Sequence, residues 1–397
     1  MHYFEFVFHK SDLQFIIYID KKYIYFNLYN IMNVLFVTSC IGFGGAAKMI
    51  NFVTDCLAKK GYCVIILNLN PVPDYVKGYE QSFNPKVKVC YVGEAQKNIH
   101  IYRIKSLVKI IKEKQINVII SFLMFPNFYS TIASWITGVP SIMSERGDPN
   151  INLSSSRLVR LKDKFIYKII NYSKGGVFQT KEASLFYSKG LRKRGIVIPN
   201  AIFLDENSIT YSTQQRHQSI VSVGRFDNVQ KRYDVMLKAF KIFSKSFPNY
   251  VLKLYGSGQD EKQIRQWVME LHLEDKVLFL GTLKKPTQHI FDDGMFVITS
   301  DFEGIPNALL EAMAVGLPVI STDCTPGGAR LLIKNESNGL IVPIGDYEAV
   351  ANAMSRFAEN SKFAESCGLN ARKVLKTFSP SIIGEKWVNY ITSIANN

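Results

Sequence analysis

Short apolar runs alternate with amphipathic segments along most of the chain. From Asn33 the order is VLFVTS, then AAKMINFVTDCLAKKG with helical spacing, then YCVIILNL. Apolar runs that lack polar alternation are typical of strands covered on both faces, and helices join such strands in parallel. We therefore predict a parallel sheet with further strands at residues 87–92, 118–122, 141–144 and 176–179, closed by the run IVIPNAI.

The same alternation begins again after a polar stretch. Residues 204–219, LDENSITYSTQQRHQS, have the composition of a linker. SIVSVGRF, VLKLYGSG, KVLFLG, MFVITS and PVISTD follow with helical segments between them. Two such arrays predict an α/β protein of two Rossmann-like domains, with parallel sheets facing across a cleft. We assign the domains to residues 32–203 and 220–380, and residues 381–397 to a final helix that packs back on the first domain.

The first 31 residues differ from the rest of the chain. MHYFEFVFHKSDLQFIIYIDKKYIYFNLYNI is crowded with aromatic residues and precedes Met32, where the first strand-like run begins. We interpret residues 1–31 as an upstream reading artefact or a disordered extension, with Met32 as the natural start. The alternative is an added edge hairpin or a membrane-touching arm.

Two glutamates flank a turn in the second array. After MFVITS the chain reads DFEGIPNALLEAMAVGLPVIS, in which Glu303 and Glu311 lie on either side of a Gly-Ile-Pro-Asn sequence. Ligands of open α/β sheets lie beyond the carboxyl ends of the strands, where helices begin. Pro306 suits the first turn of a helix, so the amides of Asn307, Ala308 and Leu309 are expected to be open to a phosphate.

A phosphate between two carboxylates restricts the kind of ligand. It would repel both glutamates, which must then accept hydrogen bonds from hydroxyl groups on either side of it. A sugar nucleotide has this order of groups, so we expect Glu303 to bind the sugar and Glu311 the ribose. Arg225 ends the strand SIVSVGR and Lys231 follows six residues later, where both could neutralise a diphosphate leaving group.

Taken together, these runs resemble the C-terminal domain of the retaining GT-B glycosyltransferases of family four. The resemblance is carried by VGRF with Lys231, LYGSG, KVLFLG, SDFEGIPNALLEAMAVGLPVISTD, PGGARLLI and NGLIVP. In the first domain, GFGGAAK resembles the glycine loop of the family, and SERGDP and VIPNAI agree with it. The resemblance extends from Met32 almost to the C-terminus.

The resemblance implies a role for each matching residue. Arg225 and Lys231 match the pair that binds the donor diphosphate, Glu303 the ligand of the sugar hydroxyls and Glu311 the ribose ligand. The donor-binding backbone would comprise Gly304, Ile305, Pro306, Asn307, Ala308 and Leu309 in the second domain, with Gly44 and Gly45 in the first. It also implies transfer with retention, without a metal and without a cofactor, because the nucleotide sugar is a substrate.

One family feature is missing from the first domain. Many members have a histidine after a first-domain strand, whereas SFLMFPN here contains none, and Asn127 is a weak substitute. Glu145 and Arg146 in SERGDP are either cleft residues or a structural ion pair. The six histidines form no cluster in the sequence, and Asp301 with Glu303 resembles a metal-binding motif only superficially, so we predict no metal site.

Charge adds an expectation about location. The chain has a formal net charge of +15, and the stretch from Lys97 to Arg194 holds 18 Lys and Arg against 5 Asp and Glu. Such a patch fits an anionic membrane surface better than nucleic acid, for which no common motif is present, or than a merely solvated face. We expect a cytoplasmic enzyme, peripheral at the inner membrane face, with a glycan acceptor linked to polyprenyl diphosphate.

The six cysteines are interpreted as reduced core thiols.

Other functions compete with this one. A glycoside hydrolase would use Glu303 and Glu311 across a single glycosidic bond. A non-catalytic, membrane-associated assembly protein could keep the fold without the chemistry. A nicotinamide dehydrogenase is weaker, because GFGGAA lacks the full GxGxxG spacing. Among donors we favour UDP-linked sugars over those of GDP or ADP.

Overall fold

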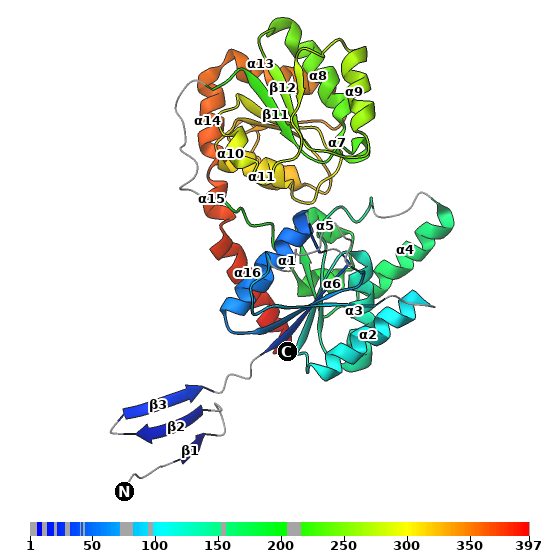
Figure 1. Ribbon diagram of the computed structural model, residues 1–397, viewed down its shortest axis with the longest axis vertical. Coiled ribbons are helices and arrows are strands. Elements are labelled where there is room, and N and C mark those ends of the chain that lie inside the picture. Colours follow the sequence, from blue (N-terminus) through cyan, green and yellow to red (C-terminus); the bar gives the residue numbers. More distant parts are fainter. Residues whose placement is uncertain are drawn as a thin grey trace.

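The computed structural model contains two α/β domains and a small N-terminal sheet (Figure 1). It describes residues 6–9, 14–19, 22–27, 32–39, 41–42, 44–71, 82–93, 98–151, 156–204 and 216–396. The prediction of two parallel-sheet domains is confirmed, because the larger sheets have seven and six strands and each is joined in parallel throughout.

The N-terminal strands form a sheet of their own. Strands β1 (Phe6–His9), β2 (Gln14–Ile19) and β3 (Lys22–Asn27) pair antiparallel in that order. In Figure 1 this sheet lies apart from both domains. The described part of residues 1–31 is therefore a three-stranded antiparallel sheet.

The first domain has a seven-stranded sheet in the order β10-β9-β8-β7-β4-β5-β6. Its strands are β4 (Asn33–Thr38), β5 (Cys63–Asn68), β6 (Lys88–Tyr91), β7 (Val118–Phe122), β8 (Ser141–Ser144), β9 (Gly175–Phe178) and β10 (Gly195–Val197). Its helices are α1 (Gly45–Lys59), α2 (Ile99–Glu113), α3 (Met124–Thr137), α4 (Arg157–Ile170), α5 (Lys181–Leu185) and α6 (Lys189–Arg194). The strand order reverses between β4 and β7, which places a ligand crevice at their carboxyl ends.

The second domain has a six-stranded sheet in the order β13-β12-β11-β14-β15-β16. Its strands are β11 (Ser219–Val223), β12 (Val251–Tyr255), β13 (Val277–Phe279), β14 (Met295–Ile298), β15 (Val319–Thr322) and β16 (Leu340–Val342). Its helices are α7 (Asn228–Lys231), α8 (Tyr233–Ser246), α9 (Glu261–Glu270), α10 (Thr287–Ile290), α11 (Asn307–Ala314), α12 (Gly328–Leu332), α13 (Tyr347–Glu359), α14 (Ser361–Ala371) and α15 (Val374–Thr377). The order reverses between β11 and β14, the strands that precede the predicted site.

Burial on both faces explains why the strands are apolar without interruption. In β4, Val34 and Phe36 belong to one core cluster, and Leu35 and Val37 belong to another on the opposite face. Successive side chains of a strand point to opposite sides, so a polar residue at any of these positions would be buried. Each fully buried side chain of this size contributes about 1.5–3 kcal/mol relative to an exposed one.

The last helix, α16 (Pro380–Ala395), returns to the first domain (Figure 1). Trp387 is fully buried in the same cluster as Phe36 and stacks on Phe122 with ring centroids 5.8 Å apart. Tyr390 accepts a hydrogen bond of 2.9 Å from the amide of Gly176 and donates one of 2.5 Å to the carbonyl of Arg194. The chain thus crosses between the domains a second time.

The predicted linker is only partly described. Residues 205–215 of the linker lie outside the described residues. The last part of the linker is anchored to the second domain, since Arg216 donates to the carbonyls of Phe291 and Gly316 at 2.8 Å.

The apolar stretch that begins at Val118 folds as β7, α3 and β8. Across the described ranges, no helix is both long enough and apolar enough to span a bilayer.

Candidate functional site

Lys231 and Glu303 form an ion pair at the carboxyl ends of β11 and β14. Nζ of Lys231 donates to Oε1 of Glu303, and the two side chains are only 15% and 11% exposed. The hydroxyl of Ser300 donates to the same carboxylate oxygen at 3.1 Å. The structure therefore brings together two of the predicted catalytic residues in a partly dehydrated setting, where electrostatic interactions are stronger than in water.

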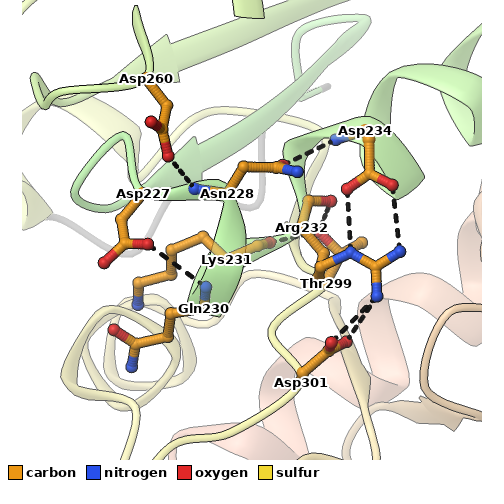
Figure 2. A network of polar contacts seen from close by, with 9 residues as sticks. All are labelled: Asp227, Asn228, Gln230, Lys231, Arg232, Asp234, Asp260, Thr299 and Asp301. Carbon is orange, nitrogen blue, oxygen red and sulfur yellow. Dashed lines mark hydrogen bonds and ion pairs between the residues drawn. The ribbon is translucent and has the colours of Figure 1, made fainter. Parts of the chain in front are cut away.

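Arg232, directly after Lys231, fixes this arrangement (Figure 2). Its guanidinium forms two hydrogen bonds to Asp234, at 2.9 and 3.0 Å, and two to Asp301, at 2.9 and 3.2 Å. These bonds tie the start of α8 to the loop that follows β14. Asp301, whose sequence position superficially resembled a metal motif, is thus a partner of an arginine.

Further hydrogen bonds hold α7 against the same loop (Figure 2). The hydroxyl of Thr299 donates to the carbonyls of Lys231 and Arg232, at 2.9 and 3.0 Å. The amide of Asp301 donates to the carbonyl of Gln230 at 2.9 Å. On the other side of α7, the amide of Asn228 donates to Asp260 at 2.7 Å. The position of Lys231 is therefore set by its neighbours as well as by Glu303.

Arg225, the third predicted catalytic residue, lies near the surface. Its side chain is 65% exposed, and it donates to Asp227 at 2.7 Å and to Gln230 at 3.2 Å. Asp227 caps α7 and Gln230 lies within it, and the guanidinium is exposed enough to turn toward an anion.

Helix α11 presents its first turn toward the first domain. Pro306 is the cap that precedes the helix, rather than part of its first turn, and its carbonyl accepts from the amide of Leu310 at 3.0 Å. The amides of the first turn, from Asn307 on, have no partner within the helix, and the dipole of α11 is positive there. The side chains of Ile305 and Leu309 are buried in the core, and each residue as a whole is at most 5% exposed.

Glu311 lies one turn further along α11. Its carboxylate is 3.3 Å from Nζ of Lys48, which belongs to α1 of the first domain. Both residues line a cavity of about 540 Å³, together with Phe203 and the segment Lys284–Gln288. Glu303 therefore lies just before α11, and Glu311 lies one turn into it.

The glycine loop of the first domain faces the same helix start. Gly44 caps α1 with φ of 118°, a conformation that other residues rarely adopt. A Cβ atom on Gly45 would lie 2.7 Å from Nδ2 of Asn307. Gly45 therefore allows the starts of α1 and α11 to approach each other, whereas Gly44 is required by its backbone conformation.

Arg146 lies behind this contact. Its guanidinium donates to Oδ1 of Asn200, and Nδ2 of Asn200 donates to Oδ1 of Asn307 at 2.7 Å. It lies over the rings of Phe122 and Trp387, at 5.5 and 6.0 Å. Burial lowers the pKa of Arg146 to about 9 despite the attraction of the neighbouring carboxylate. Its Nε and Nη1 atoms are buried without a hydrogen-bond partner.

Glu145 and Asn127 lie in the interior of the first domain. Glu145 accepts from the hydroxyl of Tyr187 at 2.5 Å and from the amide of Gly147 at 3.2 Å. Burial raises the pKa of this carboxyl, against those hydrogen bonds. The amide of Asn127 pairs with the backbone of Ser144, at 3.2 and 3.3 Å. Of the three residues considered for the cleft, these two hold the end of β8, and Arg146 alone is linked to α11.

The segment that lacks the family histidine contains an unusual backbone. Leu123, between β7 and α3, has φ of 80°, which costs energy for a residue other than glycine. It packs against the core shared with α16. Asn127 does not take the place of the histidine, because its side chain is hydrogen-bonded to the backbone of Ser144 in β8.

Gly304 forms part of the contact between the domains. A Cβ atom there would clash with the side-chain amide of Gln179 and lie 2.9 Å from the carbonyl oxygen of Arg146. Nearby, the hydroxyl of Thr180 donates to the carbonyl of Pro326 at 2.7 Å. The loop that carries Glu303 thus lies directly against the first domain.

Sequence reasoning missed Arg232, Asp234, Asn200 and Lys48. The pair Arg232 and Asp234 is visible as RYD, a charge pattern too common to single out. Lys48 follows the glycine loop, but nothing in the sequence indicates that its partner is Glu311.

The prediction of no metal site concerns another kind of residue. In the part of the chain that the structure describes, no group of three His, Cys, Asp or Glu residues could hold a metal ion.

Comparison with known proteins finds a family match in the second domain. The family described as "Glycosyl transferases group 1" matches residues 206–374, which include the predicted site of the second domain. An uncharacterised glycosyltransferase of Haemophilus influenzae is 23% identical over 348 residues, 87% of this chain and 95% of its own length.

A second relative has a detailed name. The GalNAc-alpha-(1->4)-GalNAc-alpha-(1->3)-diNAcBac-PP-undecaprenol alpha-1,4-N-acetyl-D-galactosaminyltransferase of Campylobacter jejuni is 24% identical over 375 residues, 92% of this chain and 99% of its own. Among solved structures, Anabaena HepE in complex with UDP and glucose superposes with a TM-score of 0.76 at 17% identity, covering 91% of this chain and all of that one.

The fold and the family match lead to one assignment. The solved structures that superpose on nearly the whole chain have the GT-B architecture, which is also the arrangement of the two parallel-sheet domains here. The family match covers the part of the chain that contains Arg225, Lys231, Glu303 and Glu311. Residues 206–374 match the group 1 glycosyltransferases, and the chain has the GT-B fold.

Proposed function

We propose that this glycosyltransferase moves a sugar from a UDP-linked donor to a hydroxyl of a glycan acceptor, with retention at the anomeric carbon and without a metal ion. The observation that carries the proposal is the placement of Glu303 just before α11 and of Glu311 one turn into it, beside first-turn amides that have no partner within the helix. Lys231 lies against Glu303, and Arg225 is free to turn toward the same place.

The donor diphosphate would bind at the amides of Asn307, Ala308 and Leu309. Arg225 and Lys231 would neutralise the charge that grows on the leaving phosphate as the bond to the sugar breaks. In a retaining transfer, the bond from the anomeric carbon to the diphosphate oxygen breaks. A bond to the acceptor oxygen forms on the same face. The acceptor proton passes to the departing phosphate, so no protein nucleophile is required.

Glu303 would accept hydrogen bonds from sugar hydroxyls. A carboxylate bound to two donors, Lys231 and Ser300, is held in one orientation, and each of its oxygens has two lone pairs. It can therefore keep these protein contacts and still bind hydroxyl groups of the ligand. This arrangement positions the anomeric carbon against the diphosphate without a large change in the protein.

The nucleoside would occupy the cavity of about 540 Å³ beside Glu311. Glu311 would accept from the ribose hydroxyls. The rest of the lining combines apolar residues with groups that can donate hydrogen bonds, including Lys284, Lys285 and Gln288. The two carbonyl oxygens of uracil could accept from such donors. The similar structure of Anabaena HepE, in complex with UDP and glucose, supports the choice of a uridine nucleotide.

The acceptor would be a glycan linked to polyprenyl diphosphate, in the synthesis of a bacterial surface polysaccharide such as capsule or O-antigen. The Campylobacter relative is named for an acceptor on PP-undecaprenol. Such an acceptor is confined to a membrane, and the enzyme would work at the cytoplasmic face. The surface of the first domain supports this location.

Helix α4 supplies a membrane-facing surface. Leu161, Phe165, Tyr172, Trp135 and Ile136 are each more than half exposed, and we call them the apolar stripe. The ring of Tyr172 contacts that of Trp135 at 5.7 Å, which joins α4 to the end of α3. Exposed basic residues of α4, among them Lys164 and Lys168, flank the stripe. Apolar side chains beside lysines are typical of helices that lie on anionic membranes.

A nucleotide titration tests the donor site. We expect calorimetry of the full chain to show selective binding of UDP over GDP and ADP, and to show that Arg225→Ala weakens it. Phosphate contacts to charged groups are each worth roughly 1.5–3 kcal/mol, a tenfold loss or more. Binding of no nucleotide would favour the non-catalytic assembly protein, and cleavage of a simple glycoside without nucleotide would favour the hydrolase.

A further inference from the structure

Lys48 reaches from the first domain to the nucleotide side of the second. Its Nζ lies 3.3 Å from Oε1 of Glu311, and the lysine and glutamate side chains are 52% and 17% exposed. The ion pair joins α1 to α11 across 263 residues of sequence. Glu311 is the more buried partner. Its charge is less hydrated than that of Lys48, so it needs the opposite charge beside it more than Lys48 does.

The position of Lys48 ties it to the mouth of the site. Its amide donates to the carbonyl of Gly44 at 3.0 Å, so it lies one turn into α1 from the glycine loop. It lines the cavity of about 540 Å³ together with Glu311, and also a small pocket that Gly45 and Asn307 share. Lys48 thus stands where the nucleoside and diphosphate parts of a donor would meet.

The charges around α11 explain why a cation is needed there. Lys231 is paired with Glu303 and Arg225 with Asp227, so each carries a carboxylate beside it. Glu311 adds a further negative charge close to where the diphosphate would bind. Two like charges in a partly dehydrated cleft repel strongly. Without a cation near Glu311, the group that binds the ribose would disfavour the phosphates of the same ligand.

We propose that Lys48 is a positioning residue that completes the nucleotide site from the first domain by neutralising Glu311. Glu311 can then accept from the ribose hydroxyls beside a bound diphosphate. Nucleotide affinity thereby depends on a side chain of the first domain, although the other side chains assigned to the ribose and diphosphate lie in the second. The inference rests on the proposed binding of a uridine nucleotide, and it concerns a residue outside the predicted site.

Single substitutions test the proposal in the full chain. Calorimetric titration with UDP should give about tenfold weaker binding for Lys48→Met, and a change of less than about threefold for Lys48→Arg, which keeps the charge. The matched control is Lys59→Met, which removes an ion pair of 2.7 Å between Lys59 and Asp55 on the same helix but within the first domain. It should bind UDP like the unaltered chain. Equal affinities for Lys48→Met and Lys59→Met would overturn the proposal.

A double-mutant cycle then tests the route of the effect. Glu311→Gln keeps a hydrogen-bond acceptor for the ribose but removes the charge, so adding Lys48→Met to it should change UDP affinity little. If the two substitutions instead reduce affinity independently, Lys48 acts on the phosphate directly and the proposed route through Glu311 is wrong. Failure of the unaltered chain to bind UDP would reject the proposed function itself, whereas normal binding with no effect of Lys48→Met rejects only this inference.

Discussion

Nδ2 of Asn200 donates a hydrogen bond of 2.7 Å to Oδ1 of Asn307, across the boundary between the two domains. Asn200 lies at the end of the first domain and is held by the buried guanidinium of Arg146. Asn307 is the first residue of α11. The start of the helix that we assign to the donor is therefore fixed partly by the first domain.

Replacing Asn200 tests this link. Asn200→Ala removes a hydrogen-bond acceptor of Arg146, whose Nε and Nη1 atoms already have none. The buried charge of Arg146 would then be stabilised by fewer hydrogen bonds. We expect a loss of about 1–3 kcal/mol in the free energy of unfolding, measured in urea, and a higher KM for the donor. Asn389→Ala, at an exposed position of α16, should change stability by less than about 0.5 kcal/mol. If the two variants have the same stability and the same KM, the link from Arg146 to α11 contributes neither to stability nor to donor binding.

Glu303 and Glu311 should differ in what they affect. Glu311→Ala should weaken binding of the free nucleotide by roughly 1–3 kcal/mol, because it removes hydrogen bonds to the ribose. Glu303→Ala should leave free-nucleotide affinity nearly unchanged and reduce transfer by roughly a hundredfold or more. Titration with UDP and steady-state rates separate the two effects. Similar losses in both assays for both variants would contradict the division of roles.

Gly304 should be needed for the close contact of the domains. In Gly304→Ala the new methyl group would meet the side chain of Gln179 and the carbonyl of Arg146, so we expect the transfer rate to fall. Shortening the flexible neighbour, in Gly304→Ala with Gln179→Ala, should restore part of the rate, because one of the two obstacles is removed. A double variant no faster than Gly304→Ala would show that the contact with Gln179 is unimportant.

Asp234 should contribute stability that depends on pH. Burial acts to raise its pKa, but hydrogen bonds from Arg232 and Asn228 outweigh burial and hold the pKa below the usual 3.8. A carboxyl whose pKa is lower in the folded state stabilises the fold above its unfolded pKa and loses this effect as the pH falls through the folded one. Asp234→Asn should therefore cost up to about 1 kcal/mol at pH 7. Urea unfolding at pH 7 and near pH 3 should show the difference shrinking; a constant difference would contradict it.

The apolar stripe should mediate membrane binding. We expect the full chain to sediment with vesicles that contain phosphatidylglycerol at low salt, and to stay in solution with phosphatidylcholine alone. Leu161→Ser with Phe165→Ser should weaken this binding by tenfold or more, since two large apolar side chains would no longer enter the bilayer. Leu369→Ser, at an exposed position of α14, is the control. Unchanged sedimentation of the α4 variant would place the membrane contact elsewhere.

The repeating pattern of the sequence predicted the sheets well, because strands buried on both faces admit only apolar residues. Residues 118–122 and 141–144 match β7 and β8, whereas the predicted strand at 176–179 begins and ends one residue earlier in the structure. Pro306 caps α11 rather than lying in its first turn. Such boundaries depend on local backbone angles that the pattern does not encode.

Contacts between residues far apart in the chain were beyond the reach of the sequence. The motif around Glu303 could be located, but its support by Arg232 and Asp301 joins residues 69 positions apart. Glu145 and Arg146 are neighbours in sequence, yet one carboxylate turns to Tyr187 in the interior and the other side chain turns to Asn200. A single chain gives no signal for which of two adjacent charges faces a cleft, because both directions are compatible with the same strand end.

The most direct test of the central claim is acceptor-dependent release of UDP from a panel of UDP-sugars, measured with a lipid-linked glycan extract. The unaltered chain should release UDP from one sugar of the panel only when the extract is present. Lys231→Ala and Glu303→Gln should each reduce the rate by roughly a hundredfold or more, because both act where the bond to the sugar breaks. Release that these substitutions leave unchanged, or no release from any UDP-sugar, would contradict the assignment of this site.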